Sequence, residues 1–189
     1  MSLKHDAKPV LGKPIPTTPA SGKALAVLRL AMGFLFSWAF LDKLFGLGYA
    51  TPSGGAWIGG GSPAKGFLGH VEVGPFQSPL RGMAGSGWVD LAFMLGLAGL
   101  GVAVLLGVVL RISAVAGSVL MALMWIAEWP LAQHTSSGAP SGSTNPLIDY
   151  HVVYALVLIV LAVAHAGHVW GLGRRWADLT VVRTHPWLR

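Results

Sequence analysis

Residues 88–110 read WVDLAFMLGLAGLGVAVLLGVVL, and this stretch decides the fold. Asp90 is its only charged residue, and the run is long enough to cross the roughly 30 Å hydrocarbon core of a bilayer as a helix. Apolar runs of similar length occupy 23–45, 112–131 and 146–170. The sequence therefore predicts an all-α integral membrane protein, a four-helix bundle with a long first extracytoplasmic loop.

The composition agrees with a membrane protein. Of 189 residues, 53% are hydrophobic and only 11% are charged, against roughly a quarter charged in soluble domains. The chain has no cysteine, which excludes disulfides, thiolate catalysis and c-type haem attachment. We expect a multi-pass protein of the cytoplasmic membrane.

Lys and Arg predict the orientation, because cytoplasmic loops and tails carry an excess of them. They gather in the two tails and the short turn at Arg111, so both termini should be cytoplasmic. Because the positive charge is explained by this orientation, the net charge of +6 does not indicate binding to nucleic acid. Membrane lipid is the expected partner. The predicted inner residues are Lys4, Lys8, Lys13, Lys23, Arg29, Arg111, Arg174, Arg175, Arg183 and Arg189.

The chain divides into three parts. Residues 1–22 are polar and proline-rich and should form a disordered or extended cytoplasmic tail without a signal peptide. Residues 23–173 form the membrane domain, and 174–189 a basic cytoplasmic tail. Small residues recur four apart at Gly99, Ala103 and Gly107, which favours packing within the bundle but leaves a homo-oligomer open.

Ionisable residues at the outer ends of the segments are the main candidates for chemistry. Charge inside a bilayer is costly and usually functional. With alternating helix directions, Asp42, Asp90, Glu128, Asp149 and His151 reach the same face. Glu128 is the best proton carrier, since nothing at its position needs a cap. For Asp90 and Asp149 a helix N-cap is an equal alternative.

A second polar group lies at the inner face. His165 and His168 are three apart and should share a helix face, with Arg29 at a similar depth. No histidine is placed to face them, so we expect no haem. A quinone head group is the better ligand, because it needs hydrogen-bond donors in an apolar slot. Packing and snorkelling toward lipid phosphates is the alternative.

Several motifs carry a family resemblance. The first segment, LRLAMGFLFSWAFLDKLFG, the loop motif WIGGGSPAKGFL and the run NPLIDYHVVYALVLIVLA resemble the DoxX family, and the last two its DoxD-like branch. That branch is named for the membrane subunit of thiosulfate:quinone oxidoreductase. The resemblance implies a four-helix membrane bundle, oxidation of two thiosulfates to tetrathionate, electron transfer to membrane quinone, and a smaller DoxA-like partner subunit.

We therefore expect a quinone-linked oxidoreductase subunit that uses membrane quinone and has no haem, metal or flavin site. A sulfur anion would approach the glycine-rich loop, where backbone N–H groups can hold a dianion. The residues expected to transfer protons are Glu128, Asp42, His151 and Asp149. Those expected to bind the anion are Lys65, Arg81, Lys43 and Ser62. Those expected to bind the quinone are Trp38, Trp125, His165, His168 and Arg29.

The alternative is a non-catalytic membrane anchor for soluble redox enzymes. In that case the basic tails would dock the partner or bind lipid. The buried polar residues would then only fix the helix register.

Overall fold

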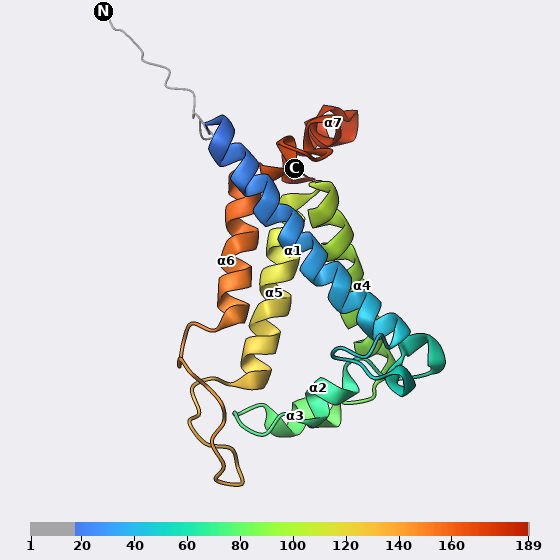
Figure 1. Ribbon diagram of the computed structural model, residues 1–189, viewed down its shortest axis with the longest axis vertical. Helices are drawn as coiled ribbons and strands as arrows, with labels where there is room; N and C mark the ends of the chain where they lie inside the picture. The colour runs from blue at the N-terminus through green and yellow to red at the C-terminus, as the bar shows by residue number, and fades with distance from the viewer. Residues whose placement is uncertain (1–17, 189) are drawn as a thin grey trace, which may run out of the picture.

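The computed structural model describes residues 18–188 and confirms an all-α protein (Figure 1). Three helices in this range are long and apolar enough to cross a membrane: α1 (Pro19–Phe45), α4 (Gly87–Leu106) and α5 (Leu110–Glu128). A fourth, α6 (Tyr150–Val163), is apolar but shorter. The chain is therefore a candidate multi-pass membrane protein. Most of the tail predicted for residues 1–22 lies outside the described residues.

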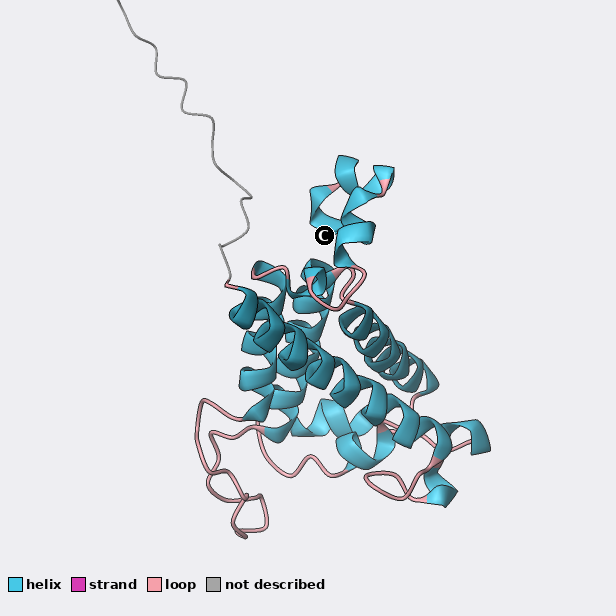
Figure 2. Ribbon diagram, turned by 45° about the horizontal axis from the view of Figure 1, so that its top comes forward, coloured by secondary structure: helices cyan, strands magenta, loops and turns pink. Residues whose placement is uncertain are grey.

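Short helices fill both ends of the molecule (Figure 2). The first connection contains η1 (Ser53–Gly55), η2 (Trp57–Gly59), α2 (Lys65–Gly69) and α3 (Gln77–Gly82). The chain closes with η3 (Ala166–His168), α7 (Gly173–Asp178), α8 (Thr180–Thr184) and η4 (Pro186–Leu188).

Several helix boundaries differ from the predicted ones for local reasons. Helix α1 begins earlier, at Pro19, because the Thr18 side chain accepts from Ser21 N and caps it. Helix α5 ends at Glu128 because Trp129 is left-handed, with φ 43°. The fourth helix was predicted over 146–170 but ends at Val163, and His165, with φ 52°, is also left-handed. His165 and His168 therefore do not share a helix face, and that prediction is wrong.

The long helices form two packed pairs that meet at one end. Helix α1 packs mainly on α4, and α5 mainly on α6. Figure 1 shows α4 diverging from α5 toward the end where α2 and α3 lie. One buried core joins the pairs, because all four helices contribute apolar side chains to it. Its members include Met32, Phe36, Leu97, Leu100, Val104, Leu110, Met121, Leu158 and Leu161.

Glycines set how closely the pairs approach. A Cβ on Gly101 would lie 2.4 Å from Ser37 Oγ, and one on Gly117 would lie 2.3 Å from Leu158 Cδ1. Gly107 packs on Gly167, as predicted for packing within the bundle. Gly99 does not, because nothing lies within 4 Å of its Cβ position. Of the predicted small-residue stripe, Gly107 thus makes a close contact, whereas Gly99 faces open space.

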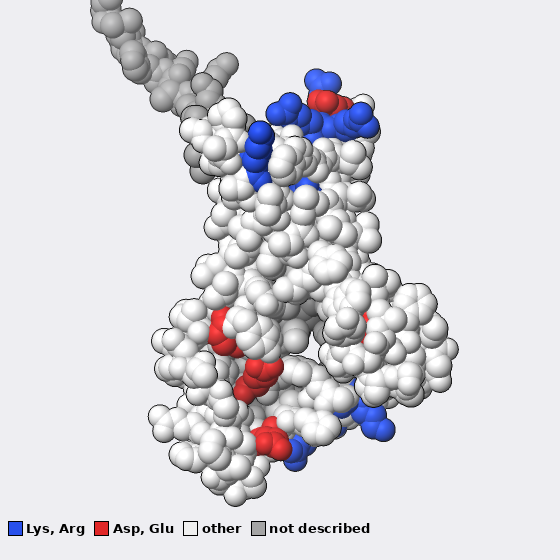
Figure 3. Space-filling view, in the orientation of Figure 1, with Lys and Arg blue, Asp and Glu red and all other residues white. Residues whose placement is uncertain are grey.

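Charge separates along the long axis (Figure 3). The end that carries α7 shows mostly Lys and Arg, whereas acidic side chains gather at the opposite end, where a few Lys and Arg also lie. The two ends therefore offer different chemistry.

Candidate functional site

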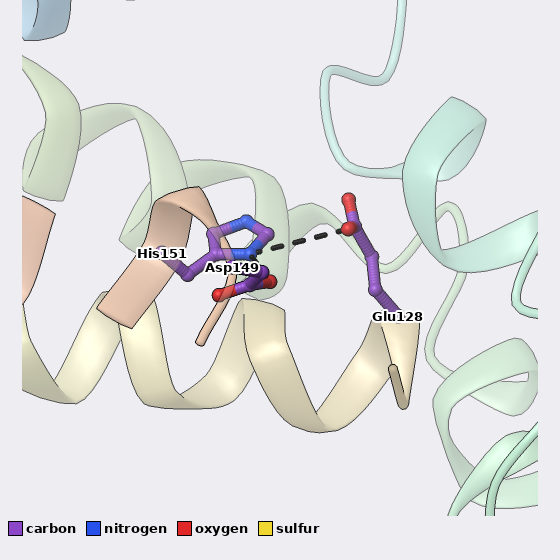
Figure 4. A group of neighbouring side chains, drawn as sticks. All are labelled: Glu128, Asp149 and His151. Atoms are coloured by element: carbon purple, nitrogen blue, oxygen red, sulfur yellow. Dashed lines mark hydrogen bonds and ion pairs between the residues drawn. The ribbon is translucent and has the colours of Figure 1, made fainter. Parts of the chain in front are cut away.

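A polar cluster forms where α5 ends and α6 begins (Figure 4). It contains Glu128, the last residue of α5, with Asp149, Tyr150 and His151. Asp149 is the N-cap of α6, and its Oδ1 accepts from Val152 N at 3.1 Å, which confirms the predicted capping role. The cap fixes the first turn of α6 and thereby directs His151 inward.

Two hydrogen bonds between side chains hold the cluster together. Tyr150 Oη donates to Glu128 Oε1 at 2.6 Å. His151 Nδ1 lies 2.8 Å from Asp149 Oδ2 and 4.0 Å from Glu128 Oε2. His151 is 1% exposed, whereas the Glu128 side chain is 37% exposed. The cluster therefore links a solvent-facing carboxylate to a buried imidazole.

The buried imidazole has one occupied nitrogen and one free nitrogen. With a proton on Nδ1 directed at Asp149, the neutral ring presents its Nε2 lone pair. Among the described residues Nε2 has no hydrogen-bond partner and is buried. Such an arrangement lets His151 accept a proton, with Asp149 stabilising the imidazolium that forms.

A cavity of about 420 Å³ lies over the cluster. Glu72, Glu128, Asp149, Tyr150 and Asn145 contribute polar side chains to its wall. None of the described residues that line it is Lys or Arg. Like charges repel, so the cavity suits a neutral or cationic ligand better than a dianion.

The first connection and the segment between α5 and α6 both line this cavity and contact each other. Ser136 N donates to the Glu72 carbonyl at 3.2 Å, which ties the segment after α5 to the first connection. Trp129 packs on Gly74, whose φ of 96° and close contact leave no room for a side chain. The first connection thus folds back over the bundle.

A second, apolar cavity of about 610 Å³ lies between α4 and α5 where these helices diverge. Small residues on both helices, including Gly99, Ala103 and Ala116, leave the space open. No described residue on its wall is charged. Phe67 and Ala127 line both cavities, so the apolar groove adjoins the polar cavity.

The structure places two predicted outer acids elsewhere. Asp42 is 1% exposed and accepts from Tyr49 N at 3.2 Å and Ala50 N at 3.1 Å. Asp90 accepts from Ala64 N at 2.8 Å, so it anchors the first connection and does not cap its own helix. Both carboxylates hold loop backbone, and neither lines the polar cavity.

The four residues predicted to hold an anion are not brought together around either cavity. Lys65 and Arg81 are exposed, and Lys43 Nζ lies 5.9 Å from the centre of the Phe93 ring. Ser62 Oγ is buried without a hydrogen-bond partner among the described residues. None of the four lines the polar cavity or the apolar groove.

At the other end Arg29 is completely buried. It donates to the carbonyls of Val104 at 2.7 Å and Trp170 at 2.8 Å, and also to that of Leu105. The carbonyls of Val104 and Leu105 lie in the last turn of α4, where the helix itself offers no i+4 donor, although Val104 also accepts from the C-cap Gly107 N at 3.1 Å. Arg29 therefore acts as a cap between three segments.

The two histidines predicted to bind a quinone lie near Arg29 without forming a large cavity. The rings of His165 and His168 are 5.5 Å apart, and His165 Nδ1 lies 3.0 Å from the Val163 carbonyl. The space that they line is only about 20 Å³. Of the predicted tryptophans, Trp38 contacts aromatic neighbours in α1 and beyond it, and Trp125 Nε1 donates to the Leu147 carbonyl at 3.2 Å.

Sequence reasoning missed Tyr150, whose hydroxyl completes the cluster. The signal was its place between Asp149 and His151 in the NPLIDYH motif. Ligating atoms of Glu128, Asp149 and His151 lie within 4.8 Å of one another, so these residues could also hold a metal ion. The prediction of no metal site stays a prediction.

The comparisons with family models, curated proteins and solved structures found no match to this chain. The resemblance to the DoxD-like branch therefore stays a prediction. The fold defines an all-α protein with three helices that could cross a membrane.

Proposed function

We propose that the chain is the quinone-reducing membrane subunit of an oxidoreductase, with thiosulfate or a related small sulfur anion as electron donor. One observation carries the proposal: Tyr150, Glu128 and Asp149 line a cavity at the end of apolar helices, with Tyr150 bonded to Glu128 and the buried His151 bonded to Asp149 behind the wall. Quinone reduction takes up protons together with electrons, so its site needs groups that exchange protons beside an apolar region.

The proposal includes a topology. Four crossings place both termini in the cytoplasm and the polar cluster at the extracytoplasmic face. The basic α7 end supports this orientation. The 14 residues of α6 rise about 21 Å, less than a bilayer core, so residues after Val163 complete the fourth crossing.

The overall reaction balances as 2 S2O3(2−) + Q + 2 H+ → S4O6(2−) + QH2. A sulfur–sulfur bond forms between two thiosulfates, and the two electrons released reduce the quinone. Each quinone oxygen gains one proton. In this scheme Glu128 takes up a proton from the outer solution, and Tyr150 gives its proton to one quinone oxygen and regains one from Glu128. The second proton comes from Asp149, which lines the cavity and takes it from the protonated His151 behind it.

The sulfur anion is bound outside the polar cavity, on a smaller partner subunit. The acidic wall of the cavity and the absence of Lys or Arg among its described lining residues support this separation. The dispersal of Lys65, Arg81 and Lys43 supports it too.

The test is thiosulfate-dependent quinol and tetrathionate formation in native membranes that carry wild-type or Glu128→Gln protein. We expect Glu128→Gln to lower the rate at least about 100-fold, because it removes the proton donor. Glu72→Gln is the matched control: it removes a carboxylate from the same cavity, and no hydrogen bond of its side chain to the cluster is found. A wild-type rate in Glu128→Gln would contradict the proposal.

One observation favours the alternative of a membrane anchor. Arg174, Arg175 and Arg183 are exposed together on α7 and α8, where a soluble redox enzyme or anionic lipid could dock. Replacing all three by Gln tests it. If the chain is an anchor, the triple variant should no longer co-purify with its partner, and Glu128→Gln should leave activity unchanged. If it is the proposed quinone subunit, the triple variant should keep its activity and Glu128→Gln should lose it.

A further inference from the structure

The polar cavity and the apolar groove together have the form of a site for one amphiphilic molecule. They adjoin at Phe67 and Ala127, which line both. We propose that a lipid quinone occupies them, with its ring beside Tyr150 and Glu128 and its isoprenoid tail between α4 and α5. The identity of the head group rests on the proposed function; the placement rests on the cavities.

The groove fits a hydrocarbon tail. Its wall is built from aliphatic and aromatic side chains of α4 and α5, roofed by Phe67, Leu68 and Leu80 from the first connection. Nothing lies within 4 Å of the Cβ position of Gly99, so the space beside α4 is open. Binding sites for apolar ligands are largely preformed clefts of several hundred Å³ with few polar groups.

The polar cavity selects the head group by charge. A phospholipid would bring a phosphate beside three carboxylates, those of Glu72, Glu128 and Asp149, against which the described wall offers His70 as its only basic side chain. A quinone ring is neutral and offers two carbonyl oxygens. The Asn145 side-chain amide lines the cavity and is a donor for such an oxygen. The Tyr150 hydroxyl also lines it and becomes a donor to the ring when Glu128 is protonated and donates to Tyr150 in turn.

This placement differs from the predicted site at His165, His168 and Arg29. The space at those histidines is about 20 Å³, against about 420 Å³ and 610 Å³ for the joined cavities. Arg29 already donates to three backbone carbonyls. The outer site has room for a ring and a tail, and the inner one does not.

The test measures direct binding of two quinones to the purified full chain in detergent. Binding is monitored through the quenching of tryptophan fluorescence. One probe is a benzoquinone with a decyl chain, and the other is the same ring without the chain. The groove-filling variant is Ala116→Leu with Gly99→Leu. The matched control is Ala122→Leu, because Ala122 is an exposed alanine of the same helix outside the groove. Gel filtration and thermal unfolding check that each variant is folded.

We expect the wild type to bind the decyl quinone more tightly than the bare ring. The groove-filled variant should bind the decyl quinone at least about tenfold more weakly and the bare ring unchanged, since only the tail loses its contacts. Ala122→Leu should behave as the wild type. Tyr150→Phe should weaken both probes, because it removes a donor to the ring.

Unchanged decyl-quinone binding in the folded groove-filled variant would overturn the placement. So would no binding by the wild type, or phospholipid in place of quinone in the groove by native mass spectrometry. The assay contains no sulfur donor, so it separates the two proposals. If the variants bind quinone as expected but native membranes form no quinol from thiosulfate, only the proposed function is wrong. If native membranes form quinol but groove filling leaves quinone binding unchanged, only the placement is wrong.

Discussion

The two ends of the helix bundle both bury ionisable side chains, but they satisfy them in different ways. At the Arg29 end the guanidinium donates only to backbone carbonyls, from Val104, Leu105 and Trp170. At the Glu128 end the side chains bond to one another, Tyr150 to Glu128 and His151 to Asp149, beside a cavity. Backbone carbonyls do not change protonation, whereas carboxylates and imidazoles do.

Packing follows the same division. At the Arg29 end Gly107 and Gly167 are in backbone contact and leave no space for a ligand. At the Glu128 end α4 and α5 diverge, and two cavities open between them and the connections. A buried charge therefore indicates chemistry only when its partners can exchange protons and a ligand can reach it; otherwise it indicates architecture.

The largest effect on stability is expected from Arg29→Met. It removes a buried donor from three carbonyls, of which Val104 keeps Gly107 N at 3.1 Å while Leu105 and Trp170 lose the guanidinium, so the cost should be about 2–4 kcal/mol. Chemical unfolding in mixed micelles measures this, with the exposed Arg111→Met as control. A loss below about 1 kcal/mol would show that Arg29 does not hold this end together.

Gly167→Ala should come next. A Cβ there would lie 1.9 Å from the Gly107 carbonyl oxygen, so the backbone must move apart, at about 2–3 kcal/mol. The same unfolding assay applies. Gly99→Ala, with open space at its Cβ position, should cost nothing measurable or stabilise the helix slightly. Equal losses in the two variants would contradict the close contact at Gly167.

Asp149 separates capping from chemistry. Asp149→Ala removes the N-cap of α6 and should cost about 1 kcal/mol. Asp149→Asn retains a capping oxygen and should keep the stability, yet it should lower quinol formation at least about tenfold, because the charge that stabilises the His151 imidazolium is gone. A wild-type rate for Asp149→Asn would make the residue a cap alone.

Tyr150→Phe should have only a small effect on stability. It removes one hydrogen bond at a solvent-facing carboxylate, so the loss should stay below about 1 kcal/mol. The rate of quinol formation should nevertheless fall at least about tenfold. Tyr154→Phe, one turn further along α6, is the control for the loss of a phenol. A fall in rate that merely follows the loss of folded protein would refute this role.

The sequence predicted features that depend on single segments. Apolar runs located the long helices, and Glu128, Asp149 and His151 were found because they are ionisable groups at the ends of such runs. It also predicted Asp42 and Lys65 for the site, but their places depend on how the first connection folds. Asp42 is engaged by backbone N–H groups, and Lys65 lies exposed outside the cavities.

The groove could not be predicted, because it arises from the divergence of two helices that each look ordinary in sequence. The end of α6 was missed for a different reason. The apolar pattern continues through His165, and only the left-handed backbone there interrupts the helix. Gly167, two residues further on, lies against Gly107, and hydropathy carries no trace of such a contact.

The most direct test of the central claim is a double-mutant cycle on quinol formation with Glu128→Gln, Tyr150→Phe and both together. If the hydrogen-bonded pair is one proton-transfer unit, the double variant should be no slower than the slower single variant. Rate losses that multiply in the folded double variant would mean that the two residues act independently, and the account of the Glu128 end would be wrong.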